Sequence, residues 1–214
     1  LLLCGTNKKA IMTAGRKAIL FIVLILILDQ ALKIWIKTTM MIGQEIHIFG
    51  RYGMIHFIEN NGMAFGMEMG GKPGKLILSI FRLVAIAGIG WYMTTLVKKN
   101  AHTGLILAVS AIMAGAIGNI IDSAFYGMIF SESTYDQVAM LFPPGGGYSS
   151  FLHGKVVDMF YFPVIQTHWP DWSPINPGES FVFFRPVFNL SDTAITCGVF
   201  SIIIFQKRMF KDLA

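Results

Sequence analysis

Charged residues are scarce in this sequence. Only 14% of its 214 residues are Asp, Glu, Lys or Arg, whereas 54% are hydrophobic. A soluble domain carries about 25% charged residues, and the mean hydropathy of this chain is +0.61. The shortage of charge therefore excludes an ordinary soluble domain and indicates a membrane protein.

Cysteine is also scarce, and histidine is not clustered. Cys4 lies near the start and Cys197 lies inside an apolar run, so no disulfide is expected. The five histidines form no HExxH motif or other close pair, which argues against a metallopeptidase. The sequence also contains no P-loop or dinucleotide-binding fingerprint.

Four apolar segments are each close to the ~20 residues needed to cross a bilayer. They cover residues 18–36, 76–97, 103–121 and about 187–206. The predicted fold class is an all-α membrane protein whose four transmembrane helices form one domain, residues 18–206. The remaining parts are a leading segment, a tail and two long connections: 1–17, 207–214, 37–75 and 122–186.

The basic residues flank the apolar segments. Nine of the seventeen lie at the two termini or in the short second connection: Lys8, Lys9, Arg16, Lys17, Lys98, Lys99, Lys207, Arg208 and Lys211. The positive-inside rule then predicts that both termini are cytoplasmic and that the two long connections are external. Because these residues form no single patch interleaved with aromatics, the net charge of +5 does not indicate a nucleic-acid partner.

The external connections have structure of their own. Residues 44–66 alternate in polarity around a glycine-containing turn, which predicts a β-hairpin. Residues 122–186 form a much longer external loop. We find no internal repeat and no inverted pair of interrupted helices, which argues against a secondary carrier.

Ionisable side chains at membrane depth are costly and are therefore functional candidates. Asp29 and Lys33 are four residues apart, so we expect an ion pair that orients its neighbours. Arg82 is close to the start of its segment and is expected to extend outward as an anchor. Asn119 and Asp122 are three residues apart and share one face at the outer edge of the third segment.

Asp192 and Asp158 both have apolar surroundings. Residues 193–206 carry no charge, and a helix of that length measures only about 21 Å, against a hydrocarbon core of roughly 30 Å. The fourth helix is therefore predicted to begin near Val187, which places Asp192 inside the apolar layer rather than at a helix cap. Asp158 is the only charged residue between Val156 and Val164.

Two such carboxylates near the outer face suggest acid–base chemistry. Like charges a few Å apart raise the pKa of one group, which leaves one acid and one base at the same pH. Such a pair can activate water against a peptide carbonyl. Two alternatives stay open. One is a Ser–Lys dyad of Ser149 or Ser150 with Lys155, and the other is a non-enzymatic carrier or assembly scaffold.

Five sequence blocks together resemble the bacterial lipoprotein signal peptidases (signal peptidase II), an aspartic peptidase family. The blocks are DQALK (29–33), NNGMAFG (60–66), GAIGNIID (115–122), KVVDMF (155–160) and FNLSD (188–192). The resemblance implies that Asp158 and Asp192 are the catalytic dyad. It also implies binding or supporting roles for the other motif residues: Asn60, Gly62, Ala64, Phe65, Asn119, Asp122, Asn189, Asp29 and Lys33.

The resemblance implies a function as well. Members of this family remove signal peptides from lipid-modified prolipoproteins, cleaving just before the diacylglyceryl-cysteine without a metal or cofactor. We therefore expect prolipoproteins and membrane lipids as partners, the cyclic peptide globomycin as an inhibitor, and a monomer. The expected location is the bacterial cytoplasmic (inner) membrane, with the active site near its outer, periplasmic face.

Two departures from the family pattern bear on the site, in addition to Met159 and Ser191, which replace the more usual Phe and Ala. Ser123 follows Asp122, where the family usually has Arg, so a cation is either missing or supplied by Arg185 or Lys155. The interval from Asp122 to Asp158 is also long, and residues 131–153 look like an insertion.

Overall fold

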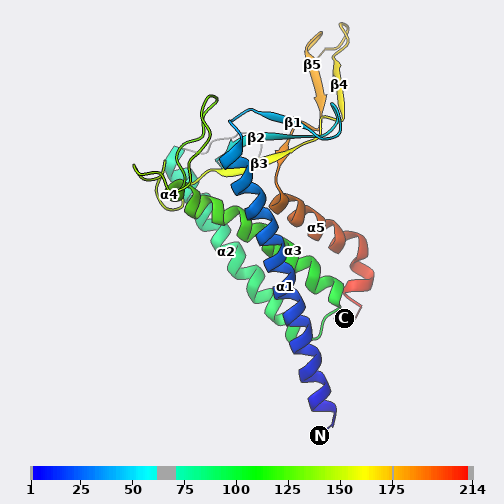
Figure 1. The fold of residues 1–214 in the computed structure, drawn as a ribbon. Helices are drawn as coiled ribbons and strands as arrows, with labels where there is room; N and C mark the ends of the chain where they lie inside the picture. Colours follow the sequence, from blue (N-terminus) through cyan, green and yellow to red (C-terminus); the bar gives the residue numbers. More distant parts are fainter. Residues whose placement is uncertain (1, 62–70, 175, 212–214) are drawn as a thin grey trace.

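Four long helices dominate the computed structural model, which describes residues 2–61, 71–174 and 176–211 (Figure 1). They are α1 (Leu2–Thr39), α2 (Gly71–Lys98), α3 (Thr103–Ile121) and α5 (Leu190–Met209). Each contains a stretch long and apolar enough to cross a membrane. The predicted fold class, an all-α membrane protein with four such helices and a small β region, is confirmed.

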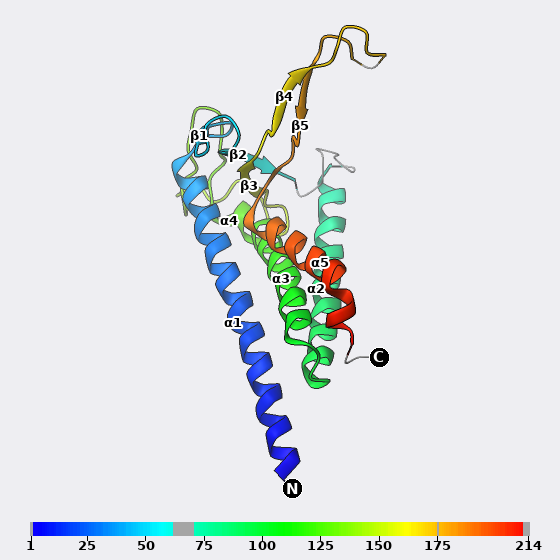
Figure 2. The same cartoon turned by 90° about the vertical axis from the view of Figure 1, so that its right-hand side faces the viewer.

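Helix α3 is the centre of the bundle and packs against α1, α2 and α5 (Figure 2). The other three helices expose large apolar side chains such as Leu24, Trp91 and Ile204, each more than half exposed, as expected of helices that face lipid. Where α3 meets α5, a Cβ atom at Gly118 would overlap the hydroxyl of Ser191. The small residues of α3 therefore allow two helices to approach closely.

The outer end of α3 continues without a break into irregular helix. A π-helical turn, η2 (Asp122–Tyr126), is followed by the short α4 (Gly127–Ile129). Such π-turns often occur at functional sites, because they shift the direction of the side chains that follow. Here the turn begins at Asp122, which is fully buried.

Helix α5 begins at Leu190, so the prediction of a start near Val187 was wrong. Val187 and Phe188 form strand β6 instead, and Asn189 is the N-cap. The helix reaches 20 residues, about 30 Å, because it continues past Lys207 and Arg208. Basic side chains at a helix end can extend to the interface, so these two do not end the span.

The main sheet has the strand order β1-β2-β3-β6, and all neighbours are antiparallel. The strands are β1 (Glu45–His47), β2 (Met54–Asn60), β3 (Val156–Tyr161) and β6 (Val187–Phe188). The β1–β2 pair confirms the predicted hairpin, although residues 62–66 of that prediction lie outside the described residues. Because β6 leads directly into α5, the sheet holds β3 beside the first turn of that helix.

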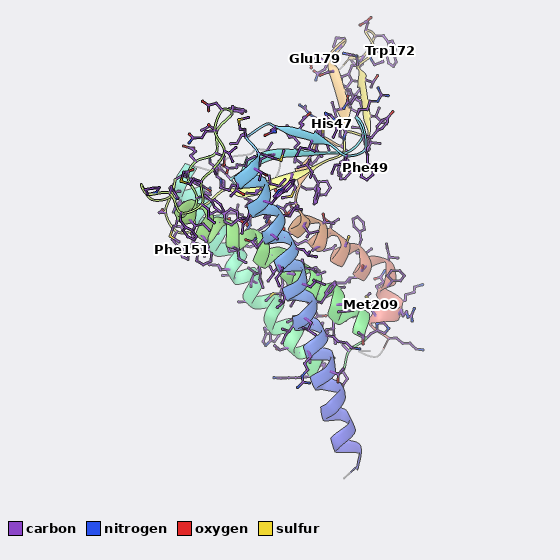
Figure 3. All side chains as sticks on the ribbon, in the orientation of Figure 1. His47, Phe49, Phe151, Trp172, Glu179 and Met209 are labelled. Carbon is purple, nitrogen blue, oxygen red and sulfur yellow. The ribbon has the colours of Figure 1, made fainter. Side chains whose placement is uncertain are left out.

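A second hairpin, β4 (Ile165–His168) and β5 (Ser180–Phe183), projects away from the helices (Figure 2). Figure 3 shows Trp172 and Glu179 at its far end, while Met209 lies at the end of α5 that points away from the sheets. Both the hairpin and the main sheet lie at the end of the bundle opposite the start of α1 (Figure 1).

Residues 131–153 pack on the outer end of α1. The ammonium of Lys37 donates to the hydroxyl of Ser133 (2.8 Å) and forms a buried ion pair with Glu59 of β2. The backbone N–H of Ile42 donates to the carbonyl of Thr134 (3.0 Å). The predicted insertion is thus fixed to α1 and to the sheet.

Candidate active site

Asp158 and Asp192 come from different elements that meet at the end of the bundle that carries the main sheet. Asp158 lies on β3 and is 2% exposed. One of its carboxylate oxygens accepts a hydrogen bond from the Asn189 amide (2.7 Å), and the other accepts one from the Asn60 amide (3.2 Å). The strand pairing of β2 with β3 places Asn60 at this site.

Asp192 lies in the first turn of α5 and forms a capping box with Asn189. The backbone N–H of Asp192 donates to Asn189 Oδ1 (2.9 Å), and the backbone N–H of Asn189 donates to Asp192 Oδ2 (3.3 Å). The expectation that Asp192 lies further along the helix and takes no part in its cap was therefore wrong. Its carboxylate accepts donors that the start of a helix leaves unpaired, and its other oxygen accepts from the Asn119 amide (2.8 Å).

Two amides link these carboxylates, and the hydrogen bonds fix how each amide is turned. Asn119 Oδ1 accepts from the ammonium of Lys33 (3.0 Å), so its NH₂ group must face Asp192. Asn189 Oδ1 accepts a backbone N–H, so its NH₂ group must face Asp158. A further bond from Asn189 to Asn119 (3.1 Å) joins the two amides.

A buried layer of charge lies directly beneath. Lys33 Nζ is 3.0 Å from Asp29 and 2.8 Å from Asp122, and all three side chains are fully buried. The predicted Asp29–Lys33 ion pair is confirmed, and its orienting role is visible: Asp29 also accepts the backbone N–H of Ser191 (2.9 Å). Asp122 accepts from Gln30 (3.0 Å), so one charge layer joins α1, α3 and α5.

The environment of Asp158 changes its acidity. Burial has the largest effect and the nearby charge of Asp192 adds to it, so the pKa of the Asp158 carboxyl rises to about 7. The hydrogen bonds from Asn60 and Asn189 and the charge of Lys33 oppose this rise only in part. At neutral pH, Asp158 is therefore poised to hold or release a proton.

Arg82 does not behave as the sequence indicated. Its guanidinium turns inward, with Nη1 3.5 Å from the hydroxyl of Ser123, and it interacts electrostatically with Asp192, Asp122 and Asp158. The expectation of an outward anchor was wrong, because the outer end of α2 packs beside the polar end of α3. The position of Arg82 along its helix does not predict the direction of its side chain. The small side chain of Ser123, however, leaves space for the guanidinium.

The other sequence candidates have varied positions. Lys155 pairs with Glu59 (3.3 Å) and Glu132 (3.4 Å), and Arg185 is exposed on the chain between β5 and β6. Gly62, Ala64 and Phe65 lie outside the described residues. Across residues 2–61, 71–174 and 176–211, no group of three or more His, Cys, Asp or Glu side chains is arranged to hold a metal.

The pairing of Lys155 bears on the serine alternative. A lysine that activates a serine must contact its hydroxyl, but the ammonium of Lys155 lies 3.3 Å from Glu59 and 3.4 Å from Glu132. Ser150 contacts His153 Nδ1 (3.1 Å), and that nitrogen also contacts the carbonyl of Phe151 (2.9 Å). The contacts of these side chains therefore favour a structural role.

Comparison with known proteins decides the family. The family model of signal peptidase (SPase) II matches residues 21–208. The chain belongs to the signal peptidase II family. It is 50% identical to the lipoprotein signal peptidase of Porphyromonas gingivalis over 195 residues, covering 91% of this chain and 84% of that protein. It is 36% identical to the lipoprotein signal peptidase of Amoebophilus asiaticus, covering 86% of this chain and 75% of that protein.

Solved structures agree with this assignment. A bacterial membrane enzyme determined by the in meso method at 2.3 Å resolution matches with a TM-score of 0.57 and 26% identity, covering 92% of this chain and 90% of that one. The family resemblance inferred from the five sequence blocks is thus confirmed. As a member of the signal peptidase II family, the protein is a multi-pass membrane peptidase.

Proposed function

We propose that this protein is an aspartic endopeptidase that removes signal peptides from lipid-modified prolipoproteins, cleaving just before the diacylglyceryl-cysteine. The observation that carries the proposal is the pair of Asp158 and Asp192, which the amides of Asn189 and Asn119 hold at one place. Membership of a family whose relatives are lipoprotein signal peptidases supports the choice of substrate.

The proposed chemistry uses the two carboxyls in different protonation states. Ionised Asp192 takes a proton from a water molecule, whose oxygen attacks the scissile carbonyl carbon. Protonated Asp158 donates a hydrogen bond to the carbonyl oxygen as negative charge develops there, and the raised pKa of Asp158 suits this role. When the tetrahedral intermediate collapses, the C–N bond breaks and the leaving amine takes a proton from the dyad.

The polar side chains around the dyad reduce the cost of reaction. Asn60, Asn119 and Asn189 are held by other groups before any substrate binds, so they need little reorganisation during the reaction. We propose that they also contact the extended peptide near the cleavage site, together with residues 62, 64 and 65. Globomycin would occupy the same place.

The membrane supplies the remaining geometry. We propose that the protein lies in the bacterial inner membrane with residues 1–17 and 207–214 in the cytoplasm and both sheets outside. The dyad then lies near the outer face, where a substrate whose diacylglyceryl group stays among the lipids presents its cleavage site. A single copy holds both acids, so a monomer is sufficient.

The test is cleavage of a lipid-modified prolipoprotein by purified wild type, Asp158→Asn and Asp192→Asn. We expect each substitution to lower kcat by at least about 10³-fold, because removing one member of a catalytic unit disables it. Asp171→Asn, an exposed residue of the β4–β5 hairpin, is the matched control and should retain wild-type activity.

Globomycin binding and thermal unfolding would show that each variant is folded. Near wild-type turnover by either dyad variant would contradict the aspartic mechanism and turn attention to Ser149, Ser150 and Lys155. Proton-coupled transport without cleavage by the wild type would instead favour a carrier.

A further inference from the structure

Arg82 brings a positive charge to the dyad from a helix that supplies none of the five sequence blocks. Its side chain is half-buried on α2, and its charge interacts most strongly with Asp192, then with Asp122 and Asp158. Ser123 Oγ lies 3.5 Å from the guanidinium and itself donates to the carbonyl of Asn119 (3.1 Å). Arg82 is thus connected to the residue whose amide binds Asp192.

The balance of charge explains why a cation is needed here. Asp29, Asp122, Asp158 and Asp192 lie within one connected network. The ammonium of Lys33 is already shared between Asp29 and Asp122 and donates to Asn119. An ionised dyad carboxylate adds a further negative charge in poorly hydrated surroundings, where an unbalanced charge is costly.

The two other cations considered from the sequence do not meet this need. Lys155 is paired with Glu59 and Glu132 beside α1, and Arg185 is exposed. Arg82, in contrast, lies on α2, a helix that supplies none of the five sequence blocks, and its guanidinium is beside Ser123.

We propose that Arg82 is a positioning residue whose charge, anchored beside Ser123, stabilises the ionised carboxylate of the dyad, in place of the arginine that usually follows the GNxxD motif. This inference rests on the proposed aspartic mechanism. The small side chain of Ser123 leaves the space, and the guanidinium reaches into it from α2 rather than from α3. The positive charge is therefore still present at the site, but it is carried by a residue of α2 and not by the residue that follows Asp122.

The test compares Arg82→Gln, Arg82→Lys and the double variant Arg82→Gln/Ser123→Arg, each assayed for kcat/KM from pH 5 to 9. Loss of the positive charge makes every ionisation of the dyad harder, so the profile of Arg82→Gln should shift to higher pH by about one unit. On the acidic side of the profile, kcat/KM should fall by up to about tenfold relative to wild type. The groups that face the dyad, Asp29, Lys33 and Asp122, are unchanged in all variants.

Charge-preserving variants make the proposal specific. Arg82→Lys should keep the wild-type profile, and Ser123→Arg should restore at least part of the shift caused by Arg82→Gln. Lys98→Gln removes a cation from the exposed, opposite end of the same helix and is the matched control. It should change neither the profile nor the rate.

A profile of Arg82→Gln that coincides with that of Lys98→Gln would overturn the proposal, as would an equal shift in Arg82→Lys. If Arg82→Gln does not fold, Arg82→Met, which also removes the charge, is measured in its place and should show the same shift. Wild type and Asp192→Asn are measured in parallel. Activity in Asp192→Asn would refute the aspartic mechanism itself, whereas its loss together with an unchanged Arg82→Gln profile would refute only the role of Arg82.

Discussion

Single side chains determine how the two carboxylates are presented. The amide oxygens of Asn119 and Asn189 each accept from a group that can only donate, an ammonium for Asn119 and a backbone N–H for Asn189. Their NH₂ groups can then only face the acids. Neither amide needs to move when the charge on the dyad changes, which is the property expected of a preorganised site.

The pH dependence of activity follows from one residue. Because the pKa of Asp158 is raised to about 7, its proton is present below that pH and is lost above it. We expect kcat/KM to fall about tenfold per pH unit above roughly pH 7, since the protonated acid is needed for reaction. The apparent value belongs to the coupled pair. A cleavage rate that stays constant up to pH 9 would contradict this assignment.

The contact between α3 and α5 determines how α5 is positioned in the bundle. At this contact the Asn119 amide of α3 donates to the Asp192 carboxylate, and Asp29 of α1 accepts the backbone N–H of Ser191 beside it. The first turn of α5 is thus held by side chains from two other helices. This dependence fixes both the height and the rotation of α5 relative to the sheet.

Gly118→Ala tests that contact. The added Cβ would overlap Ser191 Oγ and lie 2.8 Å from Asp29 Oδ2, so these side chains, or α5 itself, must shift. We expect a loss of about 1–3 kcal/mol of stability, as is typical of overpacking, together with most of the activity. Gly88→Ala on α2 is the control, because nothing lies within 4 Å of its Cβ. Thermal unfolding in detergent and the cleavage assay measure both effects, and equal behaviour of the two variants would refute the argument.

The start of α5 and the direction of Arg82 show where prediction from the sequence fails. Apolar length correctly gave four helices. Charge isolation singled out Asp158 and Asp192, and both acids are bonded to Asn189 in the structure. The start of α5 was missed because Asn189 and Asp29 satisfy its first donors, and a hydropathy pattern does not contain that information. Arg82 was misjudged for a similar reason, since its direction depends on a neighbouring helix.

The whole molecule consists of a bundle with its sheet and a projecting hairpin. The main sheet and η2 share a buried cluster of apolar residues with α1, including Ile36, Phe57, Tyr126 and Val157. Within the part of the chain that the structure describes, β4 and β5 pair only with each other and supply no residue to that cluster. The bundle and the hairpin are therefore expected to be energetically separate.

Replacing residues 165–183 with a short Gly-Ser turn tests this separation. The remaining chain still joins β3 to β6, which are antiparallel neighbours, so the sheet and α5 keep their connection. We expect the unfolding temperature to change by less than about 4 °C, which corresponds to under roughly 1 kcal/mol for a chain of this size. A large drop in unfolding temperature would show that the hairpin supports the bundle.

The bond between Asp29 and Ser191 also has a consequence for biogenesis. The two residues are 162 positions apart, so at roughly 5–20 residues per second the acid leaves the ribosome about 8–32 s before its partner. During that interval Lys33, one helical turn away, neutralises Asp29 and makes insertion of the first helix less costly. The same ion pair that later orients the site thus lets the nascent chain enter the bilayer, and hydrolytic competence arises only when the last helix has been threaded into place.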